Sequence, residues 1–497
     1  MQILSIYNIY SMPHKCTSIC KQFPKDDCNA PRCRYIDGSQ RRYCRLSYKY
    51  KMLKPSCKVT RKYKKSEVKV VAQNKINQFI NRSNRILKLL CTKSGECLAF
   101  GRKIAEINSY FKGFVGFDYI TGFIHPLGKP SANGFIKELE FERDGYRSNA
   151  ILKSSRNKNA DNLVYEYVVG MKFVNRMIQR FPCFIQTYGL YYYNTDEFWN
   201  EMQSMLYIRA HRIKQLELQN TIDYSMACSL SEYAAILVQH ISGSQAIEDI
   251  IKKTTYTDTI KYDLLYILFI LYHTLSSLSK QFTHYDLHSG NVMIIEPVPG
   301  KYIQYQYHLS ADKTISFKCP YIPKIIDYGR SFFDNGNTNS KKVYQKICNT
   351  VGCHQCGKGA GFDWLDPNPS FFISSTKKNE SHDLRLLNII HKKIDAIGNK
   401  KPTNPTFKQL ASIIKKVKYG IGLNDTDKNY GTEENLTNDP TGDDIYHIGS
   451  AFSHLKDAVC DSKVMNENQT QYIDSTKEIG VLHIYDDGRP MKYEPHM

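Results

Sequence analysis

Four side chains that could do chemistry lie close together near the middle of the chain: His284, Asp286, His288 and Asn291. They occupy a polar stretch, HYDLHSGN, between the apolar stretches DLLYILFILYHTL and VMII. The apolar stretches predict a buried helix and a buried strand. The polar stretch is therefore predicted to be a short loop held between two rigid elements, which is where catalytic residues are commonly placed.

The residue types in this loop suggest a particular reaction. The carboxylate of Asp286 can orient a hydroxyl group and accept its proton. The amide oxygen of Asn291 can ligate a hard cation without adding charge, and Asp327, at the end of the predicted strand IPKIIDYGR, can bridge to Mg²⁺. One base and two cation ligands on adjoining loops are the groups that phosphoryl transfer from a Mg-nucleotide requires.

These stretches resemble conserved motifs of the eukaryotic-type protein kinases. HYDLHSGN is similar to the catalytic loop of that family, and DYG is similar to its metal-binding DFG motif. NAILK resembles the strand that carries the nucleotide-binding lysine, here Lys153, and VYEYVV offers Glu166 as the ion-pair partner of that lysine. SHDLRLL resembles the start of a later helix whose aspartate, here Asp383, braces the catalytic loop.

The resemblance implies ATP and Mg²⁺ as cofactors, with Asp286 as the catalytic base and Asn291 and Asp327 as the magnesium ligands. Lys153, fixed by Glu166, would bind the α- and β-phosphates. Serine or threonine hydroxyl groups of protein substrates would accept the γ-phosphate.

The sequence departs from the family pattern at several points. The predicted glycine-rich loop, GKPSANGF, keeps Gly128 and Gly134 but lacks the middle glycine, so Ser131 is expected to help its backbone amides bind phosphate. Tyr285 replaces the arginine that receives an activation-loop phosphate, which predicts activity without such phosphorylation. His288 replaces a lysine and could contact the γ-phosphate when it is protonated.

Two other functions fit the same residues. The pattern HxDLHxGN also resembles the loops of atypical kinases that phosphorylate sugars, lipids or metabolites. A pseudokinase scaffold is a further alternative. The combination of FPCFIQTYG, HYDLHSGN and IIDYGRSFF is most similar to the serine/threonine protein kinases of large cytoplasmic DNA viruses of the iridovirus type. That likeness implies a protein that acts in the host cytoplasm or is carried in the virion.

The order of the predicted elements indicates an α+β fold. Strand-like patterns occupy residues 98–160, one helix follows, and helices predominate later. This order implies a two-lobed protein, and the resemblance to kinases implies a protein-kinase-like fold in three parts: a basic, Cys-rich N-terminal extension at 1–75, an N-lobe with a preceding helix at 76–240, and a C-lobe at 241–497 that contains a mobile acidic loop at 425–444.

Positive charge is concentrated at the start of the chain. The 497 residues carry a formal net charge of +20, and residues 1–66 hold 16 Lys and Arg but only three acidic residues, which is +13 of that total. A segment of this kind favours nucleic acid or an acidic partner. No apolar run reaches membrane-spanning length, so no transmembrane segment is expected.

The 15 cysteines predict reduced thiols in a cytoplasmic protein, because the start of the chain does not resemble an export signal. Six of them lie in the basic N-terminal extension with irregular spacing, which leaves scattered thiols and a structural zinc site as alternatives there. Cys353 and Cys356 form a C-x2-C half-site that could hold zinc, with Cys348 or His354 as a third ligand.

Overall fold

The computed structural model of the chain describes residues 33–37, 42–46, 89–91, 97–128, 134–155, 163–222, 224, 233–252, 262–351, 363–365, 372–398, 445, 447–461 and 469–496. The chain divides into two compact units, Met1–Ser83 and Asn84–Met497. In the first unit, the described residues form a hairpin of β1 (Cys33–Asp37) and β2 (Arg42–Leu46). The second unit has a mixed α+β architecture, and it contains every described candidate site residue.

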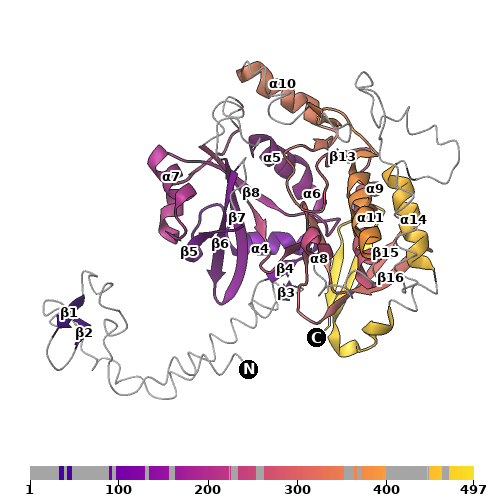
Figure 1. Cartoon of the computed structure of the whole chain (residues 1–497), viewed down its shortest axis with the longest axis horizontal. Coiled ribbons are helices and arrows are strands. Elements are labelled where there is room, and N and C mark those ends of the chain that lie inside the picture. The colour runs from indigo at the N-terminus through magenta and orange to yellow at the C-terminus, as the bar shows by residue number, and fades with distance from the viewer. Residues whose placement is uncertain are drawn as a thin grey trace. The chain divides into compact units, whose positions relative to one another are not determined.

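A curled antiparallel sheet of seven strands dominates the first part of the second unit (Figure 1). Its order is β10-β8-β11-β7-β6-β5-β9. The strands are β5 (Ile120–Pro126), β6 (Gly134–Arg143), β7 (Tyr146–Ser155), β8 (Thr187–Tyr192), β9 (Ile208–Arg209), β10 (Glu217–Leu218) and β11 (Ala234–His240). Alternate residues of β6 are buried, as expected for a strand with one face on the core.

The strand-like pattern predicted for residues 98–160 is interrupted by a helix. β3 (Leu89–Cys91) and β4 (Cys97–Ala99) pair with each other, and a 3-10 turn at Gly101–Lys103 then leads into α4 (Ile104–Tyr110). The strand prediction was wrong here because Ile107 and Phe111, four residues apart, have helical spacing and are both buried.

The helix predicted after the strand-like region 98–160 is present. It consists of α5 (Leu163–Val169), a π-helical turn at Gly170–Val174 and α6 (Asn175–Met177). It packs on the sheet through contacts of α5 with β8 and β11. A further helix, α7 (Asp196–Ser204), follows β8 and begins with Thr195, whose hydroxyl accepts the backbone N–H of Phe198.

Helices predominate in the later part of the second unit. They are α8 (Ile247–Lys252), α9 (Leu264–Ser277), α10 (Ser340–Val351), α11 (Arg385–Gly398) and α14 (Ile448–Cys460). α9 is buried along most of its length, which explains its almost wholly apolar sequence, and α14 packs against it (Figure 1). None of the helices in the described part of the chain is long and apolar enough to cross a membrane.

Short strands hold the candidate catalytic loop. β13 (Phe282–Thr283) pairs with β18 (Phe332–Phe333), and β14 (Val292–Ile295) lies between β12 (Gln245–Ala246) and β17 (Ile322–Ile325). The loop 284–291 therefore runs from β13 to β14. The sequence predicts the strand after the loop, but it places the buried helix directly before the loop and does not predict β13. A further pair is formed by β19 (Asp363–Leu365) and β20 (Phe372–Ser374).

A four-stranded sheet joins the middle of the chain to its C-terminal residues. Its order is β16-β15-β21-β22, with the strands β15 (Tyr302–His308), β16 (Thr314–Cys319), β21 (Glu478–Tyr485) and β22 (Lys492–Pro495). β15 and β21 are parallel neighbours, although about 170 residues separate them. Tyr302, Tyr305 and Tyr307 of β15 are buried, so this Tyr-rich segment contributes to the core.

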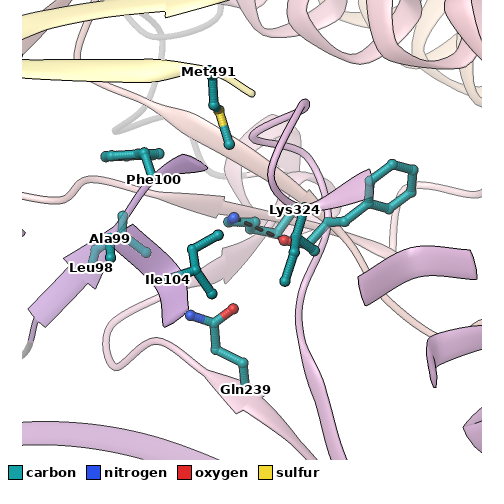
Figure 2. Close-up of a pocket in the computed structure, with 9 residues that line it drawn as sticks. Leu98, Ala99, Phe100, Ile104, Gln239, Lys324 and Met491 are labelled. Carbon is teal, nitrogen blue, oxygen red and sulfur yellow. Dashed lines mark hydrogen bonds between the residues drawn. The ribbon is translucent and has the colours of Figure 1, made fainter. Parts of the chain in front are cut away.

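Lys324 of β17 is buried in a pocket lined mainly by apolar side chains, with Gln239 as the other polar side chain. Figure 2 shows its side chain among residues that come from distant parts of the chain, including Phe100, Ile104 and Met491. Its ammonium group donates one hydrogen bond, of 2.9 Å, to the carbonyl oxygen of Phe184. Burial lowers the pKa of Lys324 to about 8 from an ordinary value of 10.5.

We expect the change Lys324→Met to stabilise the protein near neutral pH. Below pH 8 the folded state carries the full penalty of the buried charge, roughly 3 kcal/mol for a pKa lowered from 10.5 to about 8. Loss of the hydrogen bond to Phe184 offsets about 1–2 kcal/mol of the gain. Because the penalty disappears as the pH rises from 8 to 10.5, the advantage of the variant should shrink and then reverse.

Urea unfolding of both proteins at pH 7 and pH 10 measures this difference. The change Lys301→Met, at an exposed lysine, serves as the control and should alter stability equally little at both pH values. A Lys324→Met variant that is less stable than the wild type at pH 7 would show that the ammonium group is satisfied by partners such as ordered water.

Candidate functional site

Lys153 joins the seven-stranded sheet to two carboxylates from distant parts of the chain. Its ammonium nitrogen lies 2.7 Å from Oε2 of Glu166 in α5 and 3.0 Å from Oδ1 of Asp327, two residues after β17. Asp327 is 174 positions from Lys153 in the sequence. Three of the residues that the sequence singled out therefore meet at one point.

The two carboxylates that contact Lys153 differ in their exposure to solvent. The side chain of Glu166 is 5% exposed, whereas that of Asp327 is 37% exposed. Burial acts to raise the pKa of Asp327, but the charge and hydrogen bond of Lys153 outweigh this effect and hold the pKa below its ordinary value. Asp327 is therefore ionised at neutral pH, as a cation ligand must be.

The backbone around the site has two unusual conformations. Tyr285 and Asp327 have positive φ angles of 64° and 67°, in the left-handed region that costs a non-glycine residue about 1 kcal/mol. Hydrogen bonds hold Tyr285 in place, because its N–H donates to Asp383 and its hydroxyl donates to the carbonyl oxygen of Lys377. Such conformations persist only where the surroundings enforce them, and they cluster at functional sites.

His284 connects the loop 284–291 to the segment that carries Asp327. Its Nε2 donates to the carbonyl oxygen of Ile326 at 2.9 Å, and its Nδ1 accepts the backbone N–H of Asp286 at 3.2 Å. Burial lowers the pKa of His284, so the ring is neutral at pH 7 and has one donor and one acceptor nitrogen, as these two bonds require.

Asp383 holds the start of the same loop. Its carboxylate accepts the backbone N–H of His284 at 2.7 Å and that of Tyr285 at 3.0 Å. Burial raises the pKa of Asp383 to about 7, against the opposing effect of these two donors. The loop backbone is thus fixed at its start by a buried side chain from the 3-10 turn at His382–Leu384, which leads into α11.

The carboxylate of Asp286 is surrounded by basic groups. Oδ1 lies 3.0 Å from Nη1 of Arg385 and 4.0 Å from Nε2 of His288, and Oδ2 lies 3.5 Å from Nη1 of Arg330. The amide nitrogen of Asn291 donates to the carbonyl oxygen of Asp286 at 2.9 Å. This bond orients the amide of Asn291 and directs its nitrogen away from any cation, which leaves the amide oxygen as the candidate ligand.

His288 forms a hydrogen bond within its own loop. Its Nδ1 accepts the backbone N–H of Gly290 at 3.0 Å. Burial lowers the pKa of His288, and the nearby charge of Asp286 offsets this effect only in part. The ring is therefore neutral at pH 7, and the predicted contact of a protonated His288 with a γ-phosphate would become available only in more acidic solution.

The predicted glycine-rich loop is described only at its two ends. Gly128 has a φ of 71°, and Gly134 begins β6, where a Cβ atom would lie 2.5 Å from the carbonyl oxygen of Ser154. Gly134 is thus required by the close approach of β7. Ser131 lies outside the described residues, as do Cys353 and Cys356 of the predicted zinc half-site. The described part of the chain holds no group of three or more His, Cys, Asp or Glu side chains placed to bind a metal ion.

Two site residues were missed by the sequence reasoning. Arg330 and Arg385 both contact Asp286, although neither was a candidate from sequence. Their positions in the sequence could have indicated that they lie near the site, because Arg330 is three residues after Asp327 and Arg385 is two residues after Asp383. Comparison with known proteins adds no further assignment, since no family model matches the chain and no curated protein sequence matches it significantly.

Proposed function

We propose that this protein is an ATP- and Mg²⁺-dependent phosphotransferase, and specifically a serine/threonine protein kinase of the eukaryotic type. One observation carries the proposal: the Lys153 ammonium group contacts both Glu166 and Asp327, and hydrogen bonds of His284 tie the backbone beside Asp327 to the loop that holds Asp286. A buried ion pair alone would need only one carboxylate. A lysine shared by two carboxylates beside a third has the charges to bind a metal–triphosphate complex.

Each side chain has a role in this proposal. Asp286 orients the acceptor hydroxyl and accepts its proton, while Asn291 and Asp327 supply oxygen ligands for Mg²⁺. Lys153, held by Glu166, contacts the α- and β-phosphates. Mg²⁺ held by these residues would supply charge neutralisation at the transferring phosphoryl group, which leaves the side chains mainly the task of positioning the reactants.

A two-lobed arrangement of the second unit is part of the same proposal. The seven-stranded sheet and α5 carry Lys153 and Glu166, whereas the loop with Asp286 and Asn291 lies between β13 and β14, beside the helix α9. β11 leads from the sheet to α8 and so would form the link between the lobes. Nucleotide would bind where the two groups of residues face each other.

The alternatives make different use of the same residues. A pseudokinase scaffold needs no complete set of base, cation ligands and lysine, and all of these are present, so an active enzyme is favoured. A small-molecule phosphotransferase would use the same chemistry on a different acceptor.

We further propose that the protein acts in the cytoplasm and that residues 1–66 bind nucleic acid or an acidic partner, since they carry +13 of the net charge.

The direct test is transfer of labelled γ-phosphate by the purified full-length chain. We expect label on Ser and Thr of dephosphorylated casein or of the chain itself, and only with Mg²⁺ present. Mg-ATP at about 100 times its Kd should add about 2.7 kcal/mol to the free energy of unfolding. Label on sugars or lipids but not on protein would favour the small-molecule alternative. Absence of both binding and transfer would overturn the proposal.

A further inference from the structure

The carboxylate of Asp286 is held by arginines from two separate segments. Arg385, the first residue of α11, lies 3.0 Å from Oδ1, and Arg330, which follows the turn after Asp327, lies 3.5 Å from Oδ2. The side chain of Arg385 is 17% exposed, so this contact is largely shielded from water. A charge-assisted hydrogen bond of this length in a shielded position is stronger than one at the surface.

The segment from Asp383 to Arg385 therefore contacts the same loop at two points, its backbone and the side chain of Asp286. Asp383 accepts the N–H groups of His284 and Tyr285 and so fixes the loop backbone. Arg385 holds the Asp286 carboxylate, which limits its rotation about the side-chain bonds. Each carboxylate oxygen has two lone pairs, so Asp286 can still accept a hydrogen bond from an acceptor hydroxyl while it is held.

We propose that Arg385 is a positioning residue that orients the Asp286 carboxylate for proton acceptance. This inference rests on the proposed function, because it assigns Arg385 to the acceptor side of that reaction. The fixed geometry removes non-productive orientations of the carboxylate. Arg330, at the longer distance, has a smaller part in the same role.

The test compares the kcat and KM of Arg385→Leu and Arg385→Lys with those of the wild type. Arg385→Leu should lower kcat roughly 10- to 100-fold, as expected for a displaced catalytic group, and leave the KM for ATP unchanged. Arg385→Lys should recover part of kcat, because it restores a cation that can donate a hydrogen bond to Asp286.

Arg212→Leu is the matched control, because Arg212 also pairs with a carboxylate, that of Glu201 in α7, away from Asp286. It should leave kcat and the KM for ATP unchanged. If wild-type enzyme transfers phosphate and both Arg385 variants fold but keep its kcat, this inference fails while the proposed function stands. If the wild type transfers no phosphate, both fail. If Arg385→Leu does not fold, the kcat of Arg385→Lys decides.

Discussion

Asp286→Asn should reduce phosphate transfer by about 10²- to 10⁴-fold, the usual contribution of a general base. The substitution keeps the size and planar shape of the side chain, and an amide oxygen can still accept the hydrogen bond from Arg385. An amide does not accept a proton at neutral pH, so only the proton transfer is lost. The measurement is kcat for labelled phosphate transfer to the protein acceptor.

Nucleotide binding provides the internal comparison for this variant. Lys153, Asn291 and Asp327 are unchanged, so Mg-ATP should stabilise Asp286→Asn against unfolding as much as it stabilises the wild type. The control Asp457→Asn removes an exposed carboxylate on α14 and should have full activity. Undiminished transfer by Asp286→Asn would remove Asp286 from the reaction and require a different base.

Part of the site could be predicted because local patterns determine where its residues lie. The apolar stretches around HYDLHSGN form α9, which leads through a short turn to β13, and β14, as predicted, so the position of Asp286 between them followed from hydrophobic patterning. Lys153 near the end of a strand and Glu166 in the next helix are also consequences of local sequence. The meeting of Lys153 with Asp327 was anticipated only through the resemblance to kinases.

Features that depend on long-range packing could not be predicted in this way. The parallel pairing of β15 with β21 joins segments that are polar on one face and buried on the other. Neither segment has a sequence pattern that indicates which strand it pairs with. The sequence analysis did not single out Arg385, although it lies two residues after Asp383. Only the fold brings it within 3.0 Å of Asp286, because Asp383 anchors the loop beside the same helix.

Lys153→Met should affect both stability and activity, since it removes the cation shared by Glu166 and Asp327. Glu166 is almost fully buried, and removal of one partner of a buried ion pair costs about 3–5 kcal/mol. Asp327, at 37% exposed, can be solvated by water and adds little to this loss. Phosphate transfer should fall at least 10²-fold, because no other described cation contacts Asp327.

A second substitution separates the two effects. In Lys153→Met with Glu166→Gln the buried charge is gone, so most of the lost stability should return, whereas phosphate transfer should stay low. The lowered pKa of Asp327 adds a pH test, because its stabilising interaction with Lys153 is complete above the unfolded-state pKa of 3.8 and is lost as the pH falls through the folded-state value. The stability difference between wild type and Lys153→Met should therefore narrow below about pH 4. If the double variant recovered both stability and phosphate transfer, Lys153 would be a structural residue, and the charges around Asp327 would have to serve some purpose other than binding a metal–triphosphate complex.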